Sequence, residues 1–95
     1  MSETDEQQII RMLADPGRRR QGFEALVARY GEPLYWKIRR MVLSHDDADY
    51  VLQNTLLKAW SRLDTFENRS RLSTWLYRIA VNESLDFLRH RRVVQ

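Results

Sequence analysis

The stretch from Arg71 to Arg92 contains neither Pro nor Gly, and its residue types are mostly compatible with a helix. It therefore predicts one uninterrupted helix of about six turns, at roughly 3.6 residues per turn. At about 100° per residue, its side chains divide into two adjacent apolar sectors and one polar wedge. Because a surface helix usually has a single apolar stripe, we expect this helix to lie between other helices with only the polar wedge exposed.

The three groups of side chains can be read directly from the spacing. The first apolar sector contains Leu72, Leu76, Ile79, Ala80 and Phe87, and the second contains Tyr77, Val81, Leu85 and Leu88. The polar wedge contains Arg71, Trp75, Arg78, Asn82, Asp86 and Arg89. The helix then ends in a run of basic residues.

The excess positive charge lies at the same end of the chain. Residues 1–66 contain ten Lys or Arg and ten Asp or Glu, so the net charge of +3 arises within residues 67–95. A local basic excess is typical of a protein that binds a polyanion. The helix macrodipole also favours cations at a helix C-terminus, so charge alone leaves both interpretations open.

Length and composition exclude several classes of protein. The chain of 95 residues suits one small domain, and its 43% hydrophobic residues are enough for a core. The absence of Cys excludes disulfides and thiolate zinc sites and is typical of a reducing cytoplasm. No apolar run is long enough to span a membrane, and the acidic N-terminus does not resemble a signal peptide. We expect a cytoplasmic location without membrane insertion.

Two further helices are predicted before residue 44. A short helix over 3–14, with Ser2 or Thr4 as its N-cap, ends at Asp15-Pro16-Gly17. The basic triplet Arg18–Arg20 is either a phosphate contact or a solvated helix start. A long helical pattern comes next, over Gln21–Leu43, and Pro33 within it predicts a kink or a brief break.

A third long helix is predicted to start at Ser44, which is an N-cap candidate with Asp47 three residues later, and Asp46 is an equally good candidate. Its spacing turns one set of side chains inward, namely Ala48, Val51, Leu52, Leu56, Ala59, Trp60 and Leu63. The side chains of Tyr50, Gln53, Asn54 and Lys58 are left to face outward. A polar connection over Asp64–Ser70 comes after it, and Ser70 is a candidate N-cap for the last helix. No alternating segment predicts a strand. We expect a compact all-α bundle of about four helices, with its core within residues 20–92.

The residues do not form a recognisable catalytic or metal site. His45 and His90 are far apart in sequence and lack metal-ligand spacing. Asp46 and Asp47 are adjacent, so on a helix they diverge, and helix capping accounts for them better than a carboxylate pair. No Gly-rich loop with phosphate-binding spacing precedes a helix. We therefore expect a binding protein with no metal or cofactor, rather than an enzyme.

Three segments together resemble region 2 of bacterial RNA polymerase sigma factors of the extracytoplasmic-function (ECF) group. They are FEALVARY at residues 23–30, DADYVLQNT at 47–55 with Lys58-Ala59-Trp60 after it, and residues 66–92. The third segment, with TWLYRIAVN at 74–82, is the most specific of the three. The resemblance implies an all-α domain that binds core RNA polymerase at its clamp and captures the non-template strand of the minus-ten promoter element.

The resemblance also implies roles for individual residues. Phe66 and Asn82 match positions that form walls of the family's pocket for a flipped base. Residues 67–71 match the loop that varies between members, and Trp75 matches an aromatic in the melting region. The expected DNA-binding residues are Phe66, Asn68, Arg69, Ser70, Arg71, Thr74, Trp75, Arg78, Asn82 and Arg89. Trp75 remains equally interpretable as a core residue.

The expected polymerase-binding residues are Asp49, Tyr50, Gln53 and Asn54. The family usually has an acid where this chain has Tyr50 and another where it has Asn54. Acids at these positions form charge-assisted hydrogen bonds with clamp arginines. We therefore expect weaker docking on polymerase than in a typical member.

The chain lacks the C-terminal helix-turn-helix domain of the family and ends at Gln95, so we expect one domain of a longer protein or a shortened form. Two other interpretations remain. A sigma-like domain can act mainly by protein interaction, as the target of an anti-sigma factor or as a decoy for one. The chain can also be a helical bundle that merely resembles the family.

Overall fold

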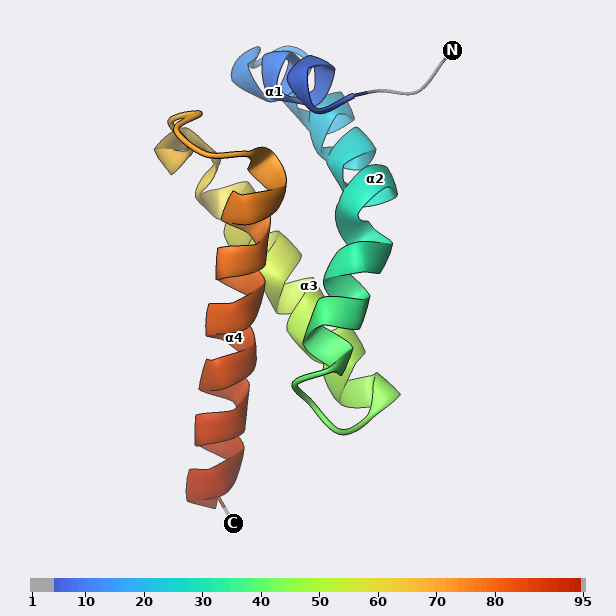
Figure 1. The fold of residues 1–95 in the computed structure, drawn as a ribbon. Helices are drawn as coiled ribbons and strands as arrows, with labels where there is room; N and C mark the ends of the chain where they lie inside the picture. Colours follow the sequence, from blue (N-terminus) through green and yellow to red (C-terminus); the bar gives the residue numbers. More distant parts are fainter. Residues whose placement is uncertain (1–4, 95) are drawn as a thin grey trace.

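The computed structural model describes residues 5–94, and the side chains of residues 5–91. These residues form four α-helices and one 3-10 turn, and the described part of the chain contains no strand (Figure 1). The elements are α1 (Glu6–Ala14), α2 (Arg19–Arg39), α3 (His45–Ser61), η1 (Leu63–Thr65) and α4 (Leu72–Val94). The predicted all-α bundle is confirmed. Figure 1 shows α1 across the N-terminal end of α2, near the loop that precedes α4.

The helix boundaries agree with the sequence patterns at α3 and, within one or two residues, at the uninterrupted α4, and they differ at α1 and α2. The Ser44 hydroxyl accepts a hydrogen bond from the Asp47 N–H at 3.1 Å, which confirms the predicted N-cap. The first helix begins at Glu6 rather than at residue 3, because Asp5 and Gln8 form a capping box there. The candidate caps Ser2 and Thr4 lie outside the described residues.

The second helix differs from its predicted range at both ends. It begins at Arg19 and ends at Arg39, four residues before Leu43, and it continues through Pro33 without a break. A proline inside a helix removes one backbone hydrogen bond, but packing of the flanking turns holds the helix together here. Leu26, Tyr30, Leu34 and Ile38 are buried on both sides of Pro33.

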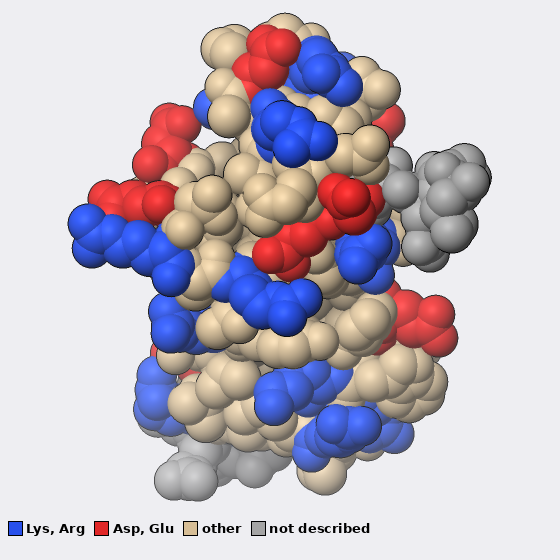
Figure 2. All heavy atoms as spheres, turned by 45° about the horizontal axis from the view of Figure 1, so that its top comes forward, with Lys and Arg blue, Asp and Glu red and all other residues tan. Residues whose placement is uncertain are grey.

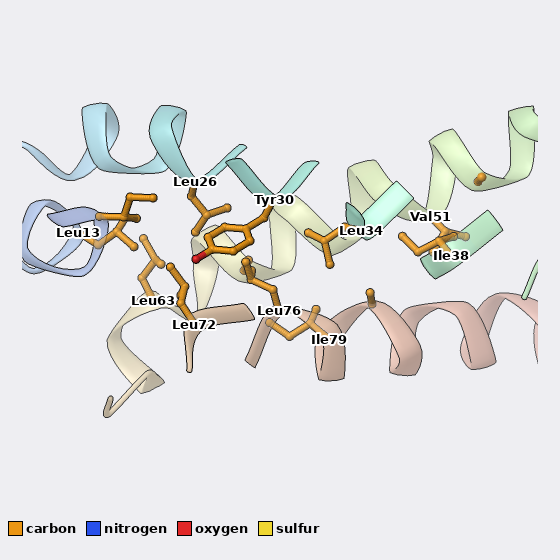
Figure 3. Close-up of a cluster of buried hydrophobic side chains, with 14 of the residues drawn as sticks. Leu13, Leu26, Tyr30, Leu34, Ile38, Val51, Leu63, Leu72, Leu76 and Ile79 are labelled. Carbon is orange, nitrogen blue, oxygen red and sulfur yellow. The ribbon is translucent and has the colours of Figure 1, made fainter. Parts of the chain in front are cut away.

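The core lies between α4 and the other helices. Leu72, Leu76, Ile79 and Ala80 of α4 are buried, as the first apolar sector predicts. Figure 3 shows Leu76 and Ile79 directed toward Leu34 and Tyr30 of α2, with Leu13 and Leu63 closing one end. Burying this sector fixes the rotation of α4 about its own axis. The rotation in turn decides which side chains of α4 reach the surface.

Burial differs from the prediction at Trp60 of α3 and at Leu85 of α4. The spacing of α3 predicts that Trp60 faces inward, but Trp60 is 43% exposed, with its ring edge-on to Phe23 of α2. Leu85, in the second apolar sector of α4, is also exposed, so the polar wedge is not the only exposed part of that helix. Thr55 is fully buried although it is polar, because its hydroxyl donates a hydrogen bond to the Val51 carbonyl at 2.8 Å. That local bond satisfies the hydroxyl without a partner on another helix.

The first helix packs closely against the second. Gly22 of α2 is buried, and a Cβ atom at this position would lie 2.8 Å from the Met12 Cβ. Only glycine therefore permits the observed approach of α1 to α2. On the α1 side, Ile9 and Leu13 are buried in the shared core. The short helix is thus a packed part of the domain.

Replacement of Leu76 by Ala should lower the free energy of unfolding by about 2–5 kcal/mol, since it leaves a cavity where α4 meets the core. Leu57→Ala is the matched control, because Leu57 is 67% exposed and its loss should change stability by less than about 0.5 kcal/mol. Urea denaturation monitored by circular dichroism measures the free energy of unfolding of both variants. Equal effects of the two substitutions would contradict the packing described here.

Candidate nucleic-acid interface

The exposed face of α4 carries the polar wedge. Arg71, immediately before α4, and Arg78, Asn82 and Arg89 within it are exposed. Trp75 is half-buried at one edge of the same face, and Thr74 is half-buried beside it. The face therefore presents cations, one amide and one indole edge along one side of the helix. Such an arrangement can bind phosphates and stack on bases.

Phe66 and Trp75 form an aromatic pair at the start of this face. Their ring centroids lie 5.3 Å apart at an interplanar angle of 55°. Both rings are half-buried and pack against the core, so each has one side in the protein and one edge toward solvent. The two interpretations of Trp75 are therefore compatible, since its ring supports the core and remains reachable from outside.

The loop between η1 and α4 makes a tight turn. Asn68 has φ of 59°, in the left-handed region that Asn tolerates better than most residues. Glu67 and Arg69 form an ion pair on its surface, with Glu67 Oε1 3.1 Å from Arg69 Nε. The predicted cap at Ser70 is wrong, because the Ser70 hydroxyl donates to the Arg71 carbonyl instead of accepting from an α4 amide.

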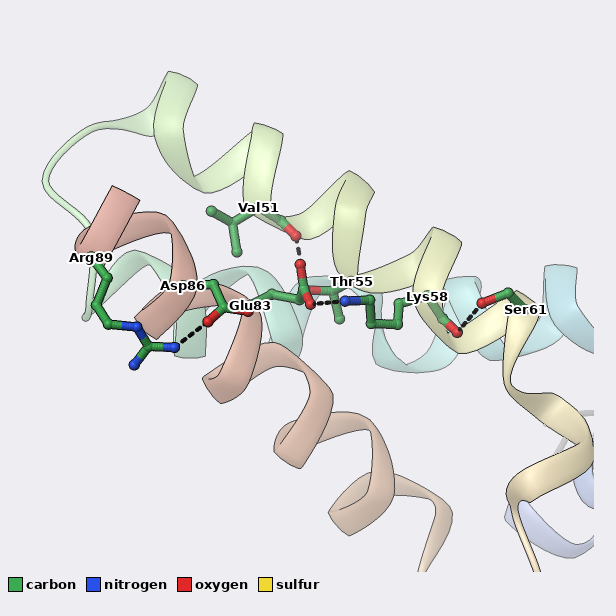
Figure 4. A network of polar contacts seen from close by, with 7 residues as sticks. All are labelled: Val51, Thr55, Lys58, Ser61, Glu83, Asp86 and Arg89. Atoms are coloured by element: carbon green, nitrogen blue, oxygen red, sulfur yellow. Dashed lines mark hydrogen bonds and ion pairs between the residues drawn. The ribbon is translucent and has the colours of Figure 1, made fainter. Parts of the chain in front are cut away.

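Asn82 lines a hollow between α3 and α4. Lys58 of α3 and Arg62, directly after α3, lie on one side of this hollow, and Glu83, Asp86 and Arg89 of α4 lie on the other. Lys58 Nζ is 2.6 Å from Glu83 Oε2, so an ion pair joins the two helices at this hollow, as Figure 4 shows. The Glu83 side chain is only 13% exposed. Asn82 therefore projects from a surface that is braced from both helices.

Sequence reasoning missed the residues that α3 contributes to this hollow. The spacing of α3 predicts only an outward position for Lys58, and it predicts no role for Arg62. Arg62 comes directly after the last residue of α3, and no ion pair is found for it among the described side chains. No spacing rule within α4 could have identified it, because it reaches the hollow through the packing of two helices.

Phe66 and Asn82 line different hollows. Phe66 belongs to one formed with Ile10, Leu13 and Ala14 of α1 and with the loop residues Glu67 and Asn68. Asn82 belongs to the hollow between α3 and α4. A common pocket with these two residues as its walls therefore stays a prediction.

The basic residues of this region are mostly paired. Arg89 pairs with Asp86, Arg69 with Glu67, and Arg91 Nη1 lies 2.7 Å from Asp47 Oδ2 of α3. Arg78 is exposed and has no ion pair among the described residues. In Figure 2, Lys and Arg side chains are separated by uncharged surface and by acids, and they form no continuous basic patch on that face. Anion binding here would proceed partly by exchange of these pairs.

The four expected polymerase-binding residues lie on α3. Tyr50 is 57% exposed, Gln53 is exposed, and Asn54 is half-buried. Leu57 lies one turn later and is also exposed, which makes this strip partly apolar. Asp49 is half-buried, and its Oδ2 lies 3.1 Å from Nε2 of His45. The strip has one acid rather than the three that the family pattern contains.

The strip and the Asn82 hollow are neighbours. Tyr50 and Asn54 line a second hollow with Phe87 and His90 of α4, and the Tyr50 and Phe87 rings lie 5.9 Å apart. Glu83 and Asp86 line both hollows. Because α3 and α4 pack along each other, the two candidate surfaces share one groove.

Glu6 connects three helices near the loop that precedes α4. Its Oε1 accepts a hydrogen bond from the Tyr30 hydroxyl of α2 at 2.8 Å, and its Oε2 accepts one from the Leu72 N–H at 3.0 Å. Leu72 is the first residue of α4, whose first N–H groups have no partner within the helix. A carboxylate of α1 therefore caps α4, which is the role predicted for Ser70.

The environment of Glu6 changes its pKa. Burial alone raises the pKa of this carboxyl, but the hydrogen bonds from the Leu72 N–H and Tyr30 and the nearby Arg71 charge lower the pKa below its ordinary value. Tyr30 shows the complementary effect, since burial and the bond to Glu6 raise its pKa. The ionised carboxylate is thus the form that the fold stabilises.

The chain matches the sigma-70 region 2 family over residues 26–93. It is 37% identical over 95 residues to RNA polymerase sigma factor CnrH of Cupriavidus metallidurans, an alignment that covers 100% of this chain and 49% of CnrH. It is 38% identical over 88 residues to the ECF sigma-E factor of Escherichia coli, covering 93% of this chain and 45% of that protein. The ECF sigma factor SigG of Mycobacterium tuberculosis is 40% identical over 79 residues, covering 82% of this chain and 21% of SigG.

This chain therefore belongs to the sigma-70 region 2 family, and the resemblance predicted from its motifs is confirmed. Region 2 is a domain of transcription initiation factors, which are binding proteins rather than enzymes. The chain spans about half or less of the length of these relatives. No helix within residues 5–94 is long and apolar enough to cross a membrane.

The Glu6 tie predicts a specific pH dependence of stability. Because folding lowers the pKa of Glu6, the tie stabilises the domain above the unfolded-state pKa and is lost as pH falls through the folded-state pKa. Wild type should therefore exceed Glu6→Gln in stability at pH 7, and the difference should shrink as the pH falls below about 4.3, the ordinary value for Glu. Urea denaturation between pH 7 and pH 3 measures this difference in the free energy of unfolding. A difference that does not change with pH would contradict an ionised tie.

Proposed function

We propose that this domain captures the non-template strand of the minus-ten promoter element as the duplex opens, while docked on the clamp of core RNA polymerase. The observation that carries the proposal is the exposed face of α4, where Arg78 and Asn82 lie beyond the Phe66–Trp75 pair along one side of the helix. The family membership supports it, since the matched region contains all four residues.

Opening a duplex without ATP requires that the melted state be stabilised by binding. Stacking of one base on an aromatic side chain contributes about 1–3 kcal/mol. That is comparable to the few kcal/mol needed to unstack and extrude a base. Phosphate contacts add a salt-dependent term. A surface with an aromatic pair, an amide and several cations contains the chemistry for each contribution.

The residues suit different parts of a single strand. Phe66 and Trp75 offer partly exposed rings for stacking where the loop meets α4. Asn82 has both donor and acceptor groups, as recognition of a base edge requires, and it lies in a hollow beside Arg62 and Lys58. Arg78 is an unpaired cation within the described residues and suits a phosphate. The loop residues would determine which DNA sequence the domain prefers, namely Asn68, Arg69, Ser70 and Arg71.

Phe66→Ala and Asn82→Ala should each weaken binding of the preferred single-stranded minus-ten oligonucleotide by at least about fivefold, because each removes a contact worth about 1 kcal/mol or more. The preferred sequence is found by titrating the 95-residue chain with an oligonucleotide library at low salt. Fluorescence anisotropy measures the affinities.

Trp36→Ala is the matched control for this experiment. Trp36 is exposed near the C-terminal end of α2, in the part of that helix that lies away from α1, and its loss should leave binding unchanged. Binding that ignores sequence and is unaffected by either substitution would reduce the α4 face to a generic electrostatic surface and contradict the proposal.

The polymerase-docking part of the proposal rests on the strip of α3. Tyr50, Gln53 and Asn54 are accessible there, and the neighbouring Asp49 is paired with His45. Neutral hydrogen bonds are weaker than charge-assisted ones, so this strip should bind a basic clamp surface less tightly than one with three acids.

Tyr50→Asp should strengthen binding to core RNA polymerase severalfold, because a hydrogen bond to a charged group contributes about 1.5–3 kcal/mol. The gain should decrease at high salt, since the new interaction lies at an exposed position. Titration of labelled domain with core polymerase tests this, and Leu43→Asp, at an exposed position before α3, controls for added charge. An unchanged affinity would contradict the assignment of this strip to the clamp.

A second candidate function is protein interaction alone, as the target or decoy of an anti-sigma factor. The observation that favours it is the apolar contact of Tyr50 with Phe87 where the family pattern has an acid. A domain of this kind needs no sequence-selective DNA binding. The oligonucleotide titration above therefore distinguishes the two functions.

A further inference from the structure

The short helix α1 precedes the segment that matches the family model, which begins at residue 26, although the alignment with CnrH includes it. It nevertheless lies beside the expected DNA-binding loop and the start of α4, as two separate features show. One is the Glu6 carboxylate, which reaches the first N–H of α4 at 3.0 Å. The other is the hollow in which Ile10 and Leu13 of α1 face Phe66 and Asn68 of the loop.

The loop has few other supports near its end. The Ser70 hydroxyl bonds to the Arg71 carbonyl and supplies no cap to α4. Asn68 adopts a left-handed backbone conformation, and the Glu67–Arg69 pair is local and exposed. In η1, just before the loop, Asp64 Oδ1 lies 3.3 Å from Nη2 of Arg19 of α2, and Arg19 Nε donates to the Leu13 carbonyl of α1. Before the loop the link to α1 therefore passes through Arg19 of α2, whereas after the loop Glu6 of α1 contacts α4 directly.

We propose that α1 is a working part of the DNA-binding unit, with Glu6 as a positioning residue that holds the loop and the first turn of α4 in the binding arrangement. The inference rests on the proposed function of this surface. In this proposal Glu6 makes no contact with DNA itself. It holds Leu72, the first residue of α4, and thereby positions Trp75 and Arg78 in the next two turns. It also fixes the position of the loop that carries Phe66.

The physical basis is preorganisation. A loop that is already ordered loses less conformational freedom on binding, so more of the contact energy appears as affinity. The effect should be larger for contacts that depend on geometry, such as base stacking and base-edge hydrogen bonds. Contacts to phosphates tolerate small displacements better, because they depend mainly on charge.

The test compares wild type with Glu6→Ala, using the preferred single-stranded oligonucleotide and a scrambled one of equal length. We expect the ratio of the two affinities to fall by roughly three- to tenfold in Glu6→Ala, with little change in affinity for the scrambled strand. Amide hydrogen exchange at Leu72 should become faster in the same variant. Affinities are measured at a temperature where both proteins are folded by circular dichroism, so that a lower folded fraction does not enter the ratio.

Two further variants separate positioning from general stability. Tyr30→Phe removes the hydroxyl that bonds to Oε1 and leaves the bond to the Leu72 N–H, so it should keep most of the discrimination. Glu6→Gln keeps the side-chain length but has one acceptor oxygen in place of two, and it replaces Glu6→Ala if that variant fails to fold. It should lose discrimination in the same direction.

The outcomes are distinct. Selective binding by wild type that Glu6→Ala retains in full would overturn the positioning role and leave the proposed function intact. An equal loss of affinity for both oligonucleotides would also overturn it, because that pattern indicates a merely structural residue. Absence of selective binding by the wild type itself would overturn the proposed function and, with it, this inference.

Discussion

Burial of one apolar sector of α4 is the constraint on which the surface depends. Leu72, Leu76, Ile79 and Ala80 pack against α2 and α3, and the hydrophobic free energy of burying them holds the helix in one rotation. At about 100° per residue, that rotation places Arg78, Asn82 and Arg89 at the surface. The composition of the candidate interface is therefore a consequence of core packing.

Core packing sets the rotation of α4, whereas polar contacts hold its first turn and its middle against neighbouring helices. Glu6 supplies a cap from another helix, and the Lys58–Glu83 pair braces α4 against α3 beside Asn82. Both contacts involve charged groups that are partly shielded from water, where electrostatic interactions are stronger than at a fully exposed surface. Tyr30 takes part in both core packing and the polar contacts, since its ring is in the core and its hydroxyl bonds to Glu6.

Periodicity and local chemistry were sufficient to predict part of the fold from the sequence. The rotation of α4, the Ser44 cap and the all-α architecture depend on residues within one element, and they are confirmed. The predictions were wrong where the local structure depends on a residue far away in the sequence. Glu6 and Leu72 are 66 positions apart, so no local rule assigns the cap of α4 to α1 rather than to Ser70. Arg62 likewise reaches the Asn82 hollow only through the packing of α3 on α4. Trp60 fits an inward spacing but lies at the edge of the α2–α3 contact, which spacing does not define.

The proposed function requires that the α4 face bind a melted strand rather than a duplex. This is tested by the affinity of the domain for one minus-ten sequence presented as single-stranded non-template DNA and as a duplex, at two salt concentrations. We expect tighter binding of the single strand and a preference that persists at the higher salt, because base stacking is not screened by ions as phosphate contacts are. Equal or tighter binding of the duplex would contradict the proposed function and would indicate an interface that recognises only the charge of DNA.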